Sequence, residues 1–105
     1  MAKNIVKSLG KVLVGTKSVL KIPIIEPVPQ NFNILKSCNC IKATLDRKSK
    51  VLTIIMTASP IPRHLLQKGK FEYIVSRSAE IVSPSNPNFK PVKVIVNMTV
   101  YENRL

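Results

Sequence analysis

The sequence is poor in the residues from which catalytic and ligand-binding sites are usually built. Among its 105 residues there are five acidic residues, three glycines, one histidine and no tryptophan. The acidic residues are scattered and His64 has no obvious partner, so the sequence offers no pair for acid–base catalysis. Three glycines are too few for a phosphate-binding loop. We therefore expect a protein that is not an enzyme and that uses no cofactor, no metal ion and no small-molecule substrate.

Long apolar runs are also absent. No segment approaches the roughly 18 consecutive apolar residues of a membrane span. The basic start of the chain, residues 1–7, is not followed by the apolar core of a signal peptide. We expect cytoplasmic synthesis without Sec export, and no membrane span.

Positive charge is abundant. The chain carries 17 Lys and Arg against five Asp and Glu, a net charge of +12 that attracts nucleic acid and other polyanions. Most of the basic residues are dispersed, which is also typical of an ordinary solvated surface. The dense exception lies at an expected hairpin tip, and its members Arg47, Lys48 and Lys50 are the candidate contacts to nucleic acid or another polyanion.

Alternation of apolar and polar residues, the pattern of half-buried β-strands, recurs along most of the chain. It covers residues 18–25, 34–45, 50–58, 71–82 and 92–100. Short polar or Pro-rich stretches separate these segments, with a single helical turn expected near His64. About five strands without a long helix predict one all-β domain, either a small antiparallel β-sandwich or a Greek-key barrel.

The beginning of the chain is ambiguous between helix and strand. We predict a strand from about Lys11 to Val14, so that the single β-domain covers residues 11–105 and is preceded by a mobile basic arm at 1–10. Such an arm could add a strand to the sheet edge of a neighbouring subunit. The residues that would do so are Lys3, Ile5, Val6 and Lys7.

Cys38 and Cys40 are the most distinctive pair in the sequence. On a continuous strand their side chains share a face with Cα atoms about 6.6 Å apart, which is two rises of ~3.3 Å and near the upper limit for a disulfide. Two interpretations remain open: small buried thiols, or exposed thiols that cross-link subunits. A zinc site would need further ligands, and His64 is the only histidine available.

One part of the chain resembles a known family. The Pro-rich segment 22–36, IPIIEPVPQNFNILK, resembles the entry to a SPOCS domain, and residues 40–44 and 50–55 are similar to the next two strands of that domain. The resemblance covers about residues 20–58. SPOCS domains are non-catalytic scaffolding modules of spore-coat and spore-envelope proteins, so the resemblance implies a structural protein of the spore surface.

These features predict a structural protein that self-assembles into a homo-oligomer, layer or filament. The charge favours a different hypothesis, a basic nucleic-acid-binding protein. A small viral capsid subunit would combine both properties, and the sequence does not separate the three.

Overall fold

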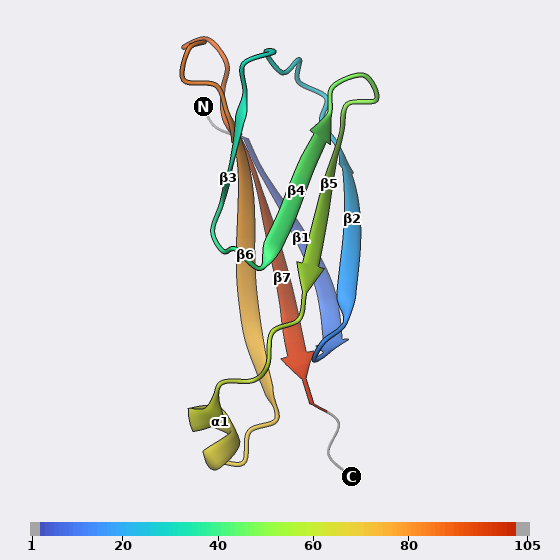
Figure 1. Cartoon of the computed structure of the whole chain (residues 1–105), viewed down its shortest axis with the longest axis vertical. Helices are drawn as coiled ribbons and strands as arrows, with labels where there is room; N and C mark the ends of the chain where they lie inside the picture. Colours follow the sequence, from blue (N-terminus) through green and yellow to red (C-terminus); the bar gives the residue numbers. More distant parts are fainter. Residues whose placement is uncertain (1–2, 103–105) are drawn as a thin grey trace.

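The computed structural model describes residues 3–102, which form two β-sheets packed face to face (Figure 1). Sheet A has four strands in the order β1-β7-β6-β3, and sheet B has three in the order β2-β5-β4. The all-β prediction is confirmed, and the architecture is a sandwich. The strands are β1 (Lys3–Leu13), β2 (Lys17–Pro23), β3 (Asn33–Lys36), β4 (Ile41–Asp46), β5 (Val51–Thr57), β6 (Glu72–Val82) and β7 (Val92–Tyr101).

The strand order follows the immunoglobulin-like pattern in all but one strand. In the constant-type immunoglobulin sandwich, strands 1, 2, 5 and 4 form one sheet and strands 3, 6 and 7 form the other. Here the first strand lies in the opposite sheet, where β1 pairs in parallel with β7 while the other pairs are antiparallel. This architecture hosts many unrelated functions, so it does not identify the activity.

The core forms where the inward faces of the two sheets meet. Alternate residues of β7, from Val92 to Val100, are buried, as the alternation in the sequence predicts. From sheet B, β5 contributes Leu52, Ile54 and Met56. Because these side chains are branched or flexible aliphatics without polar atoms, they fill the space between the sheets without leaving hydrogen-bonding groups unpaired.

The prediction of one strand over residues 34–45 is wrong. The chain leaves sheet A after Lys36, makes a turn at Ser37–Cys40 and enters sheet B at Ile41. Because Ile34 and Ile41 are an odd number of positions apart, one straight strand would place them on opposite faces. The turn lets both point inward, with Ile34 packed against the core and Ile41 only 1 % exposed.

The prediction of a mobile arm is also wrong for the described residues. Residues 3–13 form β1, which pairs along β7 from Lys3 to Leu13; Met1 and Ala2 lie outside the described residues. The register shifts between Ser8 and Lys11, where Gly10 has φ +70°. The extra residue of this bulge explains why the start of the chain lacks a regular two-residue period.

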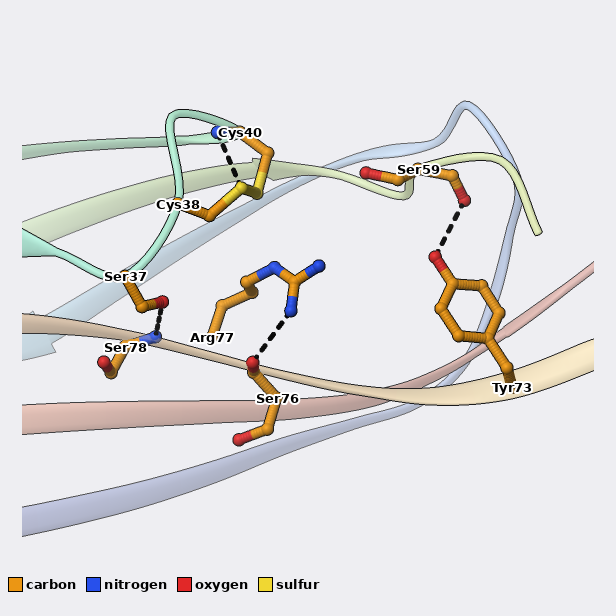
Figure 2. Close-up of a disulfide and its surroundings, with 8 residues drawn as sticks. All are labelled: Ser37, Cys38, Cys40, Ser59, Tyr73, Ser76, Arg77 and Ser78. Atoms are coloured by element: carbon orange, nitrogen blue, oxygen red, sulfur yellow. Dashed lines mark hydrogen bonds between the residues drawn. A yellow bond between two sulfur atoms is a disulfide. The ribbon is translucent and has the colours of Figure 1, made fainter. Parts of the chain in front are cut away.

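The expected helical turn is present as α1 (Arg63–Gln67), in the connection from β5 to β6. Gly69 follows it with φ +77°, a conformation that favours glycine after a helix. The Tyr73 hydroxyl donates to the Ser59 carbonyl oxygen at 3.3 Å and so holds this connection against β6 (Figure 2). None of the helices within residues 3–102 is long and apolar enough to cross a membrane.

Candidate assembly and anion-binding surfaces

The described residues do not gather a metal-ligand set. No three His, Cys, Asp or Glu side chains within residues 3–102 come together where they could hold a metal ion. His64, the one histidine, lies exposed on α1.

Cys38 and Cys40 form a disulfide with each other (Figure 2). Their Cα atoms are 5.2 Å apart, closer than on a strand, because both residues lie in the turn between β3 and β4. The Cys40 amide also donates to the Cys38 sulfur at 3.1 Å. The interpretations as free buried thiols and as links between subunits are therefore wrong for this structure, because each sulfur is already bonded within the chain.

The basic cluster lies, as predicted, at the tip of the hairpin between β4 and β5. One of its residues is hydrogen-bonded within the chain. Arg47 donates from Nε and Nη2 to the carbonyl oxygen of Val28, at 3.2 and 3.1 Å. Asp46 accepts the amides of Lys48 and Ser49, at 3.0 and 3.4 Å, and these bonds lower its pKa. Lys48 and Lys50 remain exposed, but Arg47 anchors a loop and is not a free anion-binding group.

The residues predicted for the arm are divided between the two faces of β1. Lys3 forms an ion pair with Glu26 at 2.8 Å, and Ile5 packs against the core. Val6 points away from the core and is 60 % exposed, while Lys7 is exposed at the sheet edge. Their role in the described chain is to complete the chain's own sheet.

The outward face of sheet B is the basic surface of the sandwich. Three lysines point outward from it, Lys17 and Lys21 on β2 and Lys42 on β4. Thr44, Thr53 and Thr57 share the face, and a shallow hollow of about 330 Å³ lies between Lys17 and Lys42. The acid on this face, Asp46, is bonded to the turn that follows it. We call this surface the lysine face.

The outward face of sheet A differs in charge. Four charged side chains point outward from its strands, and they are matched: Lys11 forms an ion pair with Glu72 at 3.5 Å, and Lys93 lies opposite Glu80 in the register. The same face exposes large apolar side chains among serine, threonine and asparagine. These are Val6 (60 %), Leu13 (40 %), Leu35 (54 %) and Ile74 (79 %). We call this surface the neutral face.

One stretch of strand edge in sheet A is unpaired. β6 has 11 residues, but β3 has four and pairs with the end of β6 from Ala79 to Val82. Ser37 extends this pairing to Ser78 through two hydrogen bonds. Within residues 3–102, no strand lies beside β6 from Glu72 to Ser76 on this side. Figure 1 shows β3 beside the upper part of β6 and α1 near its lower end. We call Glu72–Ser76 the open edge.

Sequence reasoning missed both the neutral face and the open edge. The signal for the first was available, because two of the five acids, Glu72 and Glu80, lie eight positions apart on one strand and therefore share a face. The open edge could not be predicted, because it exists only where β3 is too short to pair with all of β6. Comparison with protein-family models, with curated proteins and with solved structures finds no match.

Proposed function

We propose that this chain is a non-enzymatic structural subunit that self-assembles through sheet A. The observation that carries the proposal is the neutral face. A chain of net charge +12 repels its own copies, and the repulsion is weakest where two surfaces without net charge meet. Covering the exposed apolar side chains of that same surface with a partner removes them from water and so lowers the free energy of the assembly.

The size of the neutral face suits such a contact. Ten residues at ~3.3 Å and four strands at ~4.8 Å give an area of roughly 600 Å² before side chains are counted. A stable interface buries about 800 Å² on each partner. The neutral face alone is therefore at the lower end of what an interface needs, and an assembly built on it would gain from a second contact.

The setting of such an assembly remains a prediction. The resemblance of residues 20–58 to SPOCS domains favours a layer or filament at the spore surface. A small capsid subunit is the alternative with the same self-assembly. In a spore-surface layer and in a capsid alike the chain would be a repeated subunit, so the proposal of a structural subunit is the same for both settings.

Salt provides the test of self-assembly. We expect sedimentation velocity to show oligomers whose fraction rises with protein concentration, and also rises between about 0.01 and about 1 M salt as the Debye length falls from ~30 to ~3 Å. The variant Val6→Lys, on the neutral face, should weaken association, whereas Val19→Lys on the lysine face should leave it unchanged. Negative-stain electron microscopy then separates closed oligomers from layers and filaments. A monomer at every concentration and salt would refute the proposal.

A second candidate, binding of nucleic acid, is favoured by the lysine face. The ammonium groups of Lys17, Lys21 and Lys42 are suited to contact phosphates without reading bases. Here salt acts in the opposite direction, because released counterions make affinity fall as salt rises. The triple variant Lys17→Glu, Lys21→Glu, Lys42→Glu should abolish binding to a single-stranded oligonucleotide. The double variant Lys48→Glu, Lys50→Glu, at the hairpin tip, should reduce binding only slightly, and an equal loss of binding in both variants would remove the assignment to the lysine face.

A further inference from the structure

The strand edges of this sandwich differ in how they are protected against pairing with another chain. Lysines, prolines and bulges are the usual protection. Lysines lie on β1, β2, β3 and β4, with a bulge added in β1 and Pro23 in β2. The open edge carries none of these features. Its sequence is Glu-Tyr-Ile-Val-Ser, and Ile74 at its centre is the most exposed large apolar side chain of the described chain, at 79 %.

The backbone at the open edge is oriented for pairing. The Ser78 amide donates to the Ser37 hydroxyl at 2.9 Å, and the Ser78 carbonyl oxygen accepts the Ser37 amide at 3.0 Å, so both groups of Ser78 point away from β7. Along an antiparallel strand this orientation repeats at every second residue. The amides and carbonyls of Ser76, Ile74 and Glu72 therefore point to the same side.

The side chain of Arg77 covers one backbone group of this edge. Its Nη1 donates to the carbonyl oxygen of the preceding residue, Ser76, at 3.0 Å (Figure 2). Its Nε is buried and has no hydrogen-bond partner. Ser76 has the free carbonyl nearest to the paired part of the edge, and the Arg77 side chain occupies the position at that carbonyl that the amide of an added strand would take.

We propose that the open edges of two copies pair with each other, antiparallel about a two-fold axis at Ile74. The inference rests on the proposed self-assembly and names one contact within it. Because Ser78 is already bonded to Ser37, the ladder is limited to Glu72–Ser76, whose centre is Ile74. Ile74 then faces Ile74 of the second copy, and Glu72 faces Ser76. Each of the three pairs exchanges two backbone hydrogen bonds.

Charge favours a second copy as the occupant of this edge. The pairing segment contains no lysine, and its one charged residue, Glu72, is paired with Lys11 of its own chain. In the antiparallel arrangement Glu72 of one copy faces the uncharged Ser76 of the other, so the two segments meet without repulsion between like charges. The two-fold axis is perpendicular to the sheet, so the two neutral faces lie on the same side and remain free. Edge pairing by itself makes a closed dimer, and stacking of the neutral faces is the separate contact that would extend it.

A cysteine at the centre of the ladder tests this geometry. In a hydrogen-bonded pair the two Cα atoms are about 5.5 Å apart, inside the range for a disulfide. The native cysteines are bonded to each other, so Ile74→Cys introduces the single free thiol of the described chain. We expect mild oxidation to convert this variant to a covalent dimer at least ten times faster than Val19→Cys, a control on the lysine face where the side chain is 57 % exposed. Mass spectrometry should locate the bond at position 74 of both copies.

A lysine at the same position provides the second test. We expect Ile74→Lys to raise the dissociation constant of the dimer at least ten-fold, because it places two like charges opposite each other on the edge. Val19→Lys, on the lysine face, is the matched control, and circular dichroism checks that both variants fold. If the wild type associates but Ile74→Lys leaves the dissociation constant unchanged and Ile74→Cys cross-links no faster than Val19→Cys, edge pairing is overturned while self-assembly stands. If the wild type does not associate and Ile74→Cys does not cross-link, both proposals fail.

Discussion

Arg47 holds Val28 through two hydrogen bonds to a single carbonyl oxygen, across 19 positions of the sequence. The contact joins the turn between β4 and β5 to the Pro-rich connection that leads from β2 to β3. A carbonyl in a proline-rich loop lacks the regular partners that a strand or helix would provide, and the two guanidinium donors replace them. The most basic part of the sequence thus contributes to the packing of a loop.

This contact predicts different outcomes for neighbouring basic residues. Arg47→Ala should lower the free energy of unfolding by about 1 kcal/mol, because it removes two charge-assisted bonds at an exposed site. Lys48→Ala, which removes the same charge without losing a side-chain bond, should change it by less than ~0.5 kcal/mol. Urea denaturation followed by circular dichroism measures both. Equal effects of the two substitutions would show that charge and not the bond to Val28 matters.

The disulfide predicts that the cysteines do not link subunits. Non-reducing electrophoresis of oxidised protein should show no covalent oligomer, and a thiol reagent should label it only after denaturation and reduction. Cys38 and Cys40 close a loop of about three residues, for which the chain-entropy relation gives ~1.6 kcal/mol of stabilisation. The double variant Cys38→Ser, Cys40→Ser should therefore fold with a loss of about that size. Covalent dimers in the wild type would contradict the intrachain pairing.

Acid sensitivity follows from two carboxylates whose pKa values are lowered in the folded state. The hydrogen bond from Lys3 lowers the pKa of Glu26 below its usual 4.5, and the Lys48 and Ser49 amides lower that of Asp46 below its usual 3.8. A carboxylate whose folded pKa is lowered stabilises the fold at pH above its unfolded pKa, and the stabilisation is lost as pH falls through the folded pKa.

The free energy of unfolding should therefore be level above about pH 5 and fall as the pH drops below 4.5 and then 3.8. The variant Glu26→Gln should be less stable than the wild type at neutral pH, and the two should converge at low pH. Equilibrium denaturation at a series of pH values measures both curves. Parallel curves for Glu26→Gln and the wild type would contradict a role for the ion pair with Lys3.

The sequence predicts those strands of this fold in which a regular two-residue period decides which side chains are buried. β7 alternates from Val92 to Val100 and is buried at every second residue, as expected. Period alone does not reveal a change of sheet, so the alternation predicts one extended strand where the structure has β3, the Cys38–Cys40 turn and β4. The bulge at Gly10 interrupts the period of β1, so the sequence predicts a mobile arm where the structure has a strand. The partner of a strand is set by long-range contacts, so neither the open edge nor the bond from Arg47 to Val28 could be predicted locally.

The two isoleucines of β6 provide the last prediction, because they separate the stability of the subunit from its assembly. Ile81 points inward and is 0 % exposed, whereas Ile74, seven positions earlier and therefore on the opposite face, is 79 % exposed. Ile81→Ala should lower the free energy of unfolding by about 2–5 kcal/mol through lost burial and the cavity left behind. Ile74→Ala should change the stability of the isolated subunit by less than ~0.5 kcal/mol. Denaturation at low protein concentration measures these values, and sedimentation at high concentration measures association. If Ile74→Ala weakens association while the subunit keeps its stability, this side chain acts between copies; a stability loss like that of Ile81→Ala would instead place Ile74 in a core.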